Sequence, residues 1–201
     1  MPRRRLTVLA ATLGLSALAL TACSGGATSS ADPAAGADYG LVSGGTLTVA
    51  TEGTYRPFSY HEGAGELTGF DVEIAKAVAD KLGLEVKFQE TQWDAIFAGL
   101  DAGRFDVIAN QVSINPDRQE KYTFSAPYTV SRGVIVTPEG DDSISSFADL
   151  SGKTTAQSLT SNWYELATSS GAQVEAVEGW AQAVALLKQG RVDATINDQL
   201  T

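Results

Sequence analysis

Two stretches of the sequence decide the fold: WDAIFAGLDAGRFDVIAN at residues 93–110 and WAQAVALLKQGRVDATIN at residues 180–197. Aligned without a gap, both begin with Trp, contain Gly-Arg-x-Asp and end with Asn. Each pattern predicts a helix that stops at its glycine and a short apolar strand after it. Any helix–strand pair can share a glycine stop and an apolar face. The shared Trp and the shared ending Gly-Arg-x-Asp-x-x-x-Asn are more than such a pair requires. We interpret the two stretches as one plan used twice, in two lobes.

The rest of the chain continues this alternation of strands and helices. Strands are predicted at 47–50, 84–88, 106–109, 133–137, 154–157, 174–177 and 192–196. Helices are predicted at 71–82, 93–102, 161–169 and 180–189. We expect the first helix to begin with Asp71 as its cap and to end at Gly83. Such alternation is typical of an α/β fold with parallel sheets.

The repeat also predicts where a ligand would bind. In open α/β sheets, ligands bind beyond the carboxyl ends of the strands. One predicted strand ends at Asn110 and Gln111, and its counterpart ends at Asn197 and Asp198. If the two lobes face each other, these ends line a shared cleft, and clefts between domains are favoured places for small-molecule sites.

Five motifs then follow one another in a fixed order. They are ATEGTYRPF at 50–58, GFDVEIA at 69–75, WDA at 93–95, SINPDR at 113–118, and GRVDA at 190–194 followed by Asn-Asp at 197–198. From about residue 45 to residue 199, the chain resembles the bacterial extracytoplasmic solute-binding proteins of family 3, the polar amino acid capture subunits of ABC importers. The resemblance implies a two-lobed α/β periplasmic-binding-protein fold of type II. Each lobe would be a mainly parallel sheet flanked by helices, with the ligand cleft between the lobes.

The resemblance also implies a role for several side chains. Tyr55 and Trp93 would stack on the ligand, Arg118 would bind its α-carboxylate, and Asp198 would bind its α-ammonium. These residue types suit a zwitterion, because a guanidinium binds a carboxylate bidentately and a carboxylate accepts hydrogen bonds from an ammonium. A ligand that bridges Arg118 and Asp198 would favour closure of the two lobes. Taken singly, Arg118 would be a solvated turn residue and Asp198 a helix cap.

Further ligand contacts are expected from Asn110, Gln111 and Ser113, whereas Glu52 either touches the ligand or only shapes its loop. The implied function is capture of a free amino acid for an ABC transporter permease, without chemistry, cofactor or metal. Two alternatives stay open. One is a lyase similar to cyclohexadienyl dehydratases, which share the fold; the other is an amino acid sensor domain.

The second lobe departs from the family pattern at TAQSLTSNW, residues 155–163. The family has a Gly-Thr-Thr type turn here, and the turn starts a helix whose N–H groups bind the carboxylate. Ser161 and Asn162 are expected to bind in its place. The string at 156–162 is most similar to members that take up cystine. Trp180 is expected to be a packing residue.

The N-terminal residues have the pattern of a lipoprotein signal peptide, expected at 1–22. Arg3–Arg5 form a basic head, residues 6–22 are uncharged, and Cys23 follows Leu-Thr-Ala as in a lipobox. The alternative is a short helical anchor with an incidental cysteine. A lipid on Cys23 and a Gly/Ser/Ala-rich linker at 23–44 would hold the protein at the outer face of the bacterial membrane.

The expected lobes occupy residues 45–130 and 131–201, with the chain crossing between them near 129–132. The family's chain returns to its first lobe, and no such return precedes Thr201. We therefore expect the second lobe to be incomplete and the sequence to be truncated at its C-terminal end.

Composition excludes several other classes. Lys and Arg number 14 and Asp and Glu number 24, a formal net charge of −10, which disfavours nucleic acid as a partner. One Cys and one His exclude an internal disulfide and a Cys/His zinc site. The histidine, His61, lies in a Gly-rich stretch and is expected in an exposed hairpin loop.

Overall fold

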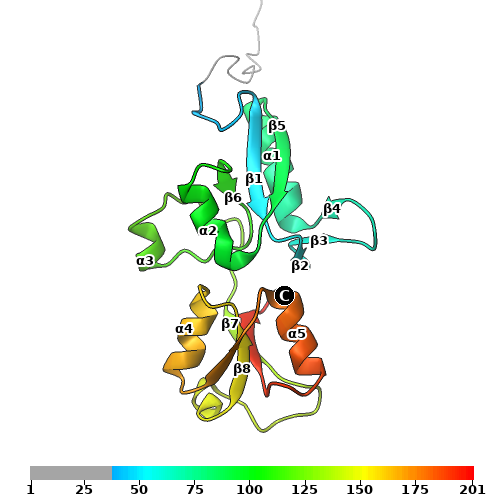
Figure 1. Cartoon of the computed structure of the whole chain (residues 1–201), viewed down its shortest axis with the longest axis vertical. Coiled ribbons are helices and arrows are strands. Elements are labelled where there is room, and N and C mark those ends of the chain that lie inside the picture. Colours follow the sequence, from blue (N-terminus) through cyan, green and yellow to red (C-terminus); the bar gives the residue numbers. More distant parts are fainter. Residues whose placement is uncertain (1–37) are drawn as a thin grey trace, which may run out of the picture. The chain divides into compact units, whose positions relative to one another are not determined.

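The computed structural model describes residues 38–201, so the expected signal peptide, Cys23 and most of the linker lie outside the described residues. Two groups of elements follow one another along the chain (Figure 1). The first lobe contains β1 (Thr46–Thr51), β2 (Thr54–Tyr55), β3 (Ser59–His61), β4 (Leu67–Thr68), α1 (Phe70–Leu82), β5 (Glu85–Glu90), α2 (Trp93–Asp101), β6 (Val107–Ile108) and α3 (Pro116–Gln119). The second lobe contains β7 (Gly133–Val136), the 3-10 helix η1 (Phe147–Leu150), β8 (Thr154–Gln157), α4 (Asn162–Ser169), β9 (Gln173–Ala176), α5 (Trp180–Lys188) and β10 (Thr195–Asp198).

β1 is the central strand of the first lobe. It pairs in parallel with β5 on one side and with β6 on the other. Leu47 and Val49 pack against α1, whereas Ala50 packs against Trp93 and Ile96 of α2. Helices therefore cover both faces of β1, which explains why the strand carries no charged residue.

α1 lies between two glycines. Gly69 is the N-cap with φ 124°, and Gly83 ends the helix in the left-handed conformation, as expected. The expectation that Asp71 caps this helix is wrong. Asp71 lies inside the first turn, is fully buried, and accepts hydrogen bonds from the side chains of Gln111 and Tyr128. Because these donors lie 40 and 57 residues away, no local pattern could assign this role.

The sequence repeat is also a repeat of helix endings. After α2, the Arg104 N–H donates to the Gly99 carbonyl at 3.0 Å. After α5, the Arg191 N–H donates to the Leu186 carbonyl, also at 3.0 Å. Both bonds span five residues and close a turn around the glycine that stops the helix.

The aspartate of each repeat then binds a neighbouring strand twice. The Asp106 N–H donates to the Thr48 carbonyl at 2.8 Å, and the Asp106 carboxylate accepts the Thr48 N–H at 2.7 Å. Asp193 makes the same pair of bonds with Thr154, at 2.8 and 2.7 Å. In each lobe the carboxylate thus satisfies a backbone N–H at the strand, which gives a physical reason for the recurrence of Gly-Arg-x-Asp.

The second lobe combines parallel and antiparallel pairing. β8 pairs in parallel with β9, β10 pairs antiparallel with β7, and a parallel bridge between Thr155 and Ala194 joins the two pairs. The strand expected at 192–196 begins later, at Thr195. Val192 is instead buried against α5, and Asp193 is occupied by its two bonds to Thr154.

Within the described residues, each apolar cluster stays inside one lobe. Two clusters form around β1, one with α1 and one with α2. Two others form in the second lobe, one against α5 and one against α4. No shared apolar core therefore fixes the lobes to each other in this part of the chain, and hydrogen bonds cross between them.

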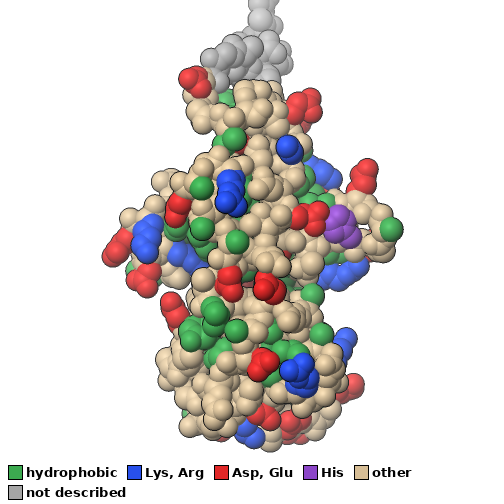
Figure 2. Space-filling view, viewed as in Figure 1, with side chains coloured by type: hydrophobic (Ala, Val, Ile, Leu, Met, Phe, Trp, Pro, Cys, Tyr) green, Lys and Arg blue, Asp and Glu red, His purple; other side chains and the backbone are tan. Residues whose placement is uncertain are grey.

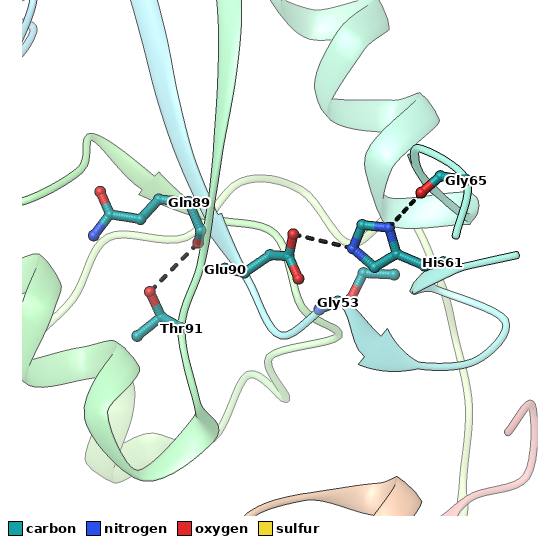
Figure 3. Close-up of polar contacts among 7 residues, drawn as sticks. Gly53, His61, Gly65, Gln89, Glu90 and Thr91 are labelled. Carbon is teal, nitrogen blue, oxygen red and sulfur yellow. Dashed lines mark hydrogen bonds and ion pairs between the residues drawn. The ribbon is translucent and has the colours of Figure 1, made fainter. Parts of the chain in front are cut away.

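The hairpin of β3 and β4 carries the chain's one histidine (Figure 3). His61 Nε2 lies 3.0 Å from Glu90 Oε1 of β5, and Nδ1 lies 2.9 Å from the Gly65 carbonyl oxygen. Both partners are acceptors, so the ring satisfies both only when it carries two protons. The other oxygen of Glu90 lies against Gly53, where φ is 72° and a methyl group would collide with it. Gly53 lies in the turn that leads from β1 to Tyr55 of β2.

We expect the pKa of His61 to lie above its ordinary 6.5, because the Gly65 carbonyl and the Glu90 carboxylate both favour the imidazolium. Glu90→Gln should lower this pKa, since it removes the charge and keeps the side-chain size. An NMR titration of the single imidazole measures both values. Glu62→Gln serves as the control, because this nearby carboxylate forms its ion pair with Arg56 instead. Equal pKa values in Glu90→Gln and the unaltered chain would contradict the contact.

Candidate functional site

A cavity lies between the lobes, at the carboxyl ends of β1, β8 and β10. Its volume is about 510 Å³, including space open to solvent. The first lobe lines it with Glu52, Tyr55, Trp93, Asn110, Gln111 and Ser113. The second lobe contributes the polar residues Gln157, Ser158, Ser161, Asn162, Thr195, Asn197 and Asp198. The structure therefore brings all of the expected ligand residues to one cavity except Arg118.

Asn110 organises the first-lobe wall. Its Oδ1 accepts hydrogen bonds from Thr51 Oγ1 at 3.0 Å and from the Glu52 N–H at 2.8 Å. Its Nδ2 donates to Glu52 Oε2 at 2.7 Å. Asn110 is only 1% exposed, so its side chain mainly holds Glu52 in place.

Glu52 is a half-buried carboxyl at the cavity wall. Burial raises its pKa to about 7, the hydrogen bond from Asn110 opposes that shift, and the negative charge of Asp94 adds to it. Its Oε1 lies so close to Gly179 of the second lobe that a methyl group there would collide with it. Glu52 therefore touches both the cavity and the opposite lobe, and its carboxyl takes up a proton more readily than that of an ordinary glutamate.

Gln111 carries a strained backbone at the cavity edge. Its φ is +49°, a left-handed value that is uncommon for residues with a side chain. The Asp71 carboxylate accepts both its N–H, at 2.9 Å, and its side-chain amide, at 2.5 Å. Thr129 Oγ1 donates to its Oε1 at 2.7 Å. These three bonds hold the strained residue, and burial raises the pKa of Asp71.

Arg118 lies behind the cavity wall. Its Nη1 donates to the Ser113 carbonyl at 3.0 Å and to Asn162 Oδ1 at 3.4 Å, and both of these residues line the cavity. The guanidinium also lies 5.3 Å from the Trp93 ring centre and 5.2 Å from that of Phe97. Burial lowers its pKa. Within residues 38–201 it forms no ion pair, so a 9%-exposed cation is held by neutral acceptors.

Tyr55 crosses from the first lobe to the second. Its hydroxyl lies 2.9 Å from Asn197 Oδ1 and 3.4 Å from Asp198 Oδ2. Burial raises the pKa of Asp198, and hydrogen bonds from Ser131 and Tyr55 oppose that shift. The expected ammonium acceptor therefore sits at the cavity as a carboxylate without a basic partner in the described ion pairs.

Ser161 and Asn162 have partners of their own. Ser161 is the N-cap of α4, and its Oγ accepts the Tyr164 N–H at 3.1 Å. Asn162 is the first residue of α4 and accepts from Arg118. Both side chains still line the cavity, at the N-terminal end of an eight-residue helix.

Sequence reasoning missed several lining residues. Gln157 and Ser158 follow from the end of β8, where the strand-end rule used for Asn110 would have found them. Trp180 packs against the α5 cluster, as expected, but it also lines the cavity. Trp93 is 8% exposed, and its indole N–H lacks an acceptor among the described residues. No sequence pattern signals that free donor.

Together, these features define a class: a two-lobed α/β protein with a polar and aromatic cleft at its strand ends, as solute-binding proteins have. The chain belongs to the bacterial extracellular solute-binding proteins, family 3, whose family model matches residues 47–169. The expected fold class is thereby confirmed. Among residues 38–201, no helix has the length and apolar character to cross a membrane.

The relatives and solved structures that the chain resembles are amino-acid-binding proteins. The chain is 59% identical over 155 residues to a probable amino-acid ABC transporter-binding protein of Haemophilus influenzae, covering 77% of this chain and 60% of that protein. It is 53% identical over 197 residues to the L-cystine-binding protein TcyA of Bacillus subtilis, covering 96% and 73%. A solved ancestral arginine-binding protein bound to arginine has a TM-score of 0.72 at 38% identity, covering 77% and 70%. The chain thus spans 60% to 73% of the length of these proteins.

We expect Glu52 to make stability fall as pH rises. Its folded-state pKa of about 7 exceeds the ordinary 4.5, so the native state holds the proton more tightly than the unfolded state. Ionisation of Glu52 therefore lowers the free energy of unfolding. This loss grows from pH 4.5 to above pH 7 and reaches at most about 3 kcal/mol. Glu52→Gln should therefore flatten this slope. Thermal melting between pH 5 and pH 8 measures it, and identical slopes would contradict the raised pKa.

Proposed function

We propose that the chain captures a polar amino acid outside the cytoplasmic membrane and delivers it to the permease of an ABC importer. The observation that carries this proposal is the shared cavity, where the carboxylate of Asp198 and the aromatic rings of Tyr55 and Trp93 meet. A carboxylate suits an α-ammonium, and the rings suit the apolar part of a ligand.

Arg118 is our proposed partner for the α-carboxylate. Its guanidinium is buried, has no acidic partner among the described ion pairs, and contacts two cavity-lining residues, Ser113 and Asn162. Glu165 acts on Arg118 through its negative charge but forms no ion pair with it within residues 38–201, so the guanidinium keeps its capacity for an incoming anion. The other expected contacts, from Glu52, Asn110, Gln111 and Ser161, are proposed in the same cleft.

Cystine is the amino acid that we favour. The relative TcyA is named as an L-cystine-binding protein, and the match covers 96% of this chain and 73% of TcyA. We also propose that a lipid on Cys23 anchors the protein to the extracytoplasmic face of the bacterial cell membrane. The proposed lobe limits are 45–130 and 131–201.

We propose binding without turnover. A lyase would need an acid or base at the reacting carbon of its substrate. An acceptor for an α-ammonium, such as Asp198, serves binding instead. A sensor domain would use the same cleft, so the two functions differ in the partner rather than in the ligand.

A thermal-shift screen of the chain against the common amino acids and cystine tests the proposal. A ligand at about 1,000 times its Kd adds roughly 4 kcal/mol to the folded state, so the true ligand should raise the Tm clearly. We expect cystine, or a small group of amino acids that includes it, to do so. A protein that is folded by circular dichroism and shifts with none of them would overturn the proposal, and turnover of a prephenate-like compound would favour the lyase.

Two substitutions separate the expected roles at the two ends of the ligand. Arg118→Ala should abolish binding of every amino acid that binds, because all share the α-carboxylate. Asp198→Asn should weaken amino acids by about tenfold or more while it affects their des-amino analogues little, since a charge-assisted hydrogen bond contributes roughly 1.5–3 kcal/mol. Calorimetric titration measures both. Arg104→Ala, at an exposed turn arginine, is the control for Arg118→Ala. Equal weakening of amino acids and analogues by Asp198→Asn would contradict the proposal that Asp198 binds the α-ammonium.

A further inference from the structure

A carboxylate of the first lobe binds the second lobe outside the cavity. Asp94 lies in the first turn of α2, next to Trp93. Its Oδ1 accepts the Thr160 N–H at 3.0 Å and the Thr160 hydroxyl at 2.7 Å. Thr160 lies in the loop between β8 and α4. One oxygen atom of the first lobe therefore holds two donors of the second.

The surroundings of Asp94 favour this contact. Asp94 lies at the N-terminal end of α2, and Thr160 directly precedes Ser161, the N-cap of α4. Both helix ends carry partial positive charge, which stabilises a carboxylate placed between them. Hydrogen bonds to an ionised acceptor are also stronger than neutral ones. No ion pair of the described residues involves Asp94, so Thr160 has no cationic competitor.

The loop that Asp94 holds carries part of the cavity wall. Ser158, Ser161 and Asn162 line the cavity, whereas Asp94 and Thr160 do not. Fixing Thr160 therefore fixes its neighbours at the cleft without adding a contact to the ligand. The effect matters because the apolar clusters of the described residues stay within single lobes. Figure 2 shows acidic side chains near the level where the two lobes meet.

We propose that Asp94 is a positioning residue that holds the loop 158–162 against the first lobe and so sets the closed fraction of the ligand-free protein. The inference rests on the proposed capture of an amino acid. A ligand that needs both lobes binds in proportion to the closed fraction. Asp94 therefore strengthens capture and slows release without touching the ligand.

The first measurement uses no ligand. Spin labels at Lys81→Cys in α1 and Lys188→Cys in α5 report the distance between the lobes, in a full chain that carries Cys23→Ser. Both lysines are exposed, at the C-terminal ends of their helices. Asp94→Ala should lengthen the mean distance and broaden its distribution. A distribution equal to that of the unaltered chain would overturn the proposal.

The second measurement uses L-cystine as the probe. Asp94→Ala should speed its release and weaken its binding by about tenfold, the scale expected when charge-assisted hydrogen bonds are lost. The matched control is Asp101→Ala, which removes the last acid of the same helix; this acid binds Tyr122 within the first lobe. That variant should leave both the distance and the release rate unchanged. If the unaltered chain binds no cystine, the proposed ligand is wrong, and the distance measurement still decides the role of Asp94.

Substitutions at Thr160 guard against a folding defect in Asp94→Ala. Thr160→Ser keeps both donors and should behave as the unaltered chain does. Thr160→Val keeps the shape and the N–H but loses the hydroxyl, so it should produce a smaller shift in the same direction as Asp94→Ala. Equal behaviour of Thr160→Ser and Thr160→Val in both measurements would contradict a role for the hydroxyl bond, and with it the proposal.

Discussion

Hydrogen bonds between first-lobe side chains and second-lobe groups are the interactions on which the cleft depends. Tyr55 reaches Asn197, Asp94 reaches Thr160, and Arg118 reaches Asn162. In the described residues, each apolar cluster is confined to one lobe, so burial stabilises the lobes separately. Directional polar contacts break and form at lower cost than a packed core. This arrangement suits a protein that must open to admit a ligand and close to keep it.

Charge is distributed unevenly around the cavity. Glu52 and Asp198 line it, whereas no Lys, Arg or His side chain does. The Arg118 guanidinium lies behind the wall and is held by Ser113 and Asn162. The cavity wall therefore offers acceptors for positively charged groups. Arg118, which we propose as the partner of the ligand's carboxylate, contacts the wall residues Ser113 and Asn162 from behind. None of these three groups forms an ion pair among the described residues, so each can pair with an incoming group of opposite charge.

The repeat shows how far local patterns carry a prediction. Gly-Arg-x-Asp predicted two helix stops and two strands, and the structure adds the reason for the aspartate, which binds Thr48 in one lobe and Thr154 in the other. The same patterns failed where a side chain serves a distant partner. Asp71 looked like a helix cap and is instead the buried acceptor for Gln111. For Trp180 the expected packing against the α5 cluster is confirmed, and the structure adds that it lines the cavity.

The sequence by itself determined the four longer helices, seven of the strands and the family, and nine of the ten residues that we expected at the ligand line the cavity. Helix periods, glycine stops and strand ends depend on neighbours a few positions apart, so they can be predicted from the local sequence. The tertiary structure decided which side chains meet across the cleft, as Asp94 does with Thr160 over 66 positions. It also decided that Arg118 lies behind the wall and that the pKa of Glu52 rises to about 7. Those properties depend on burial and on charges brought close by folding, and no local pattern encodes either quantity.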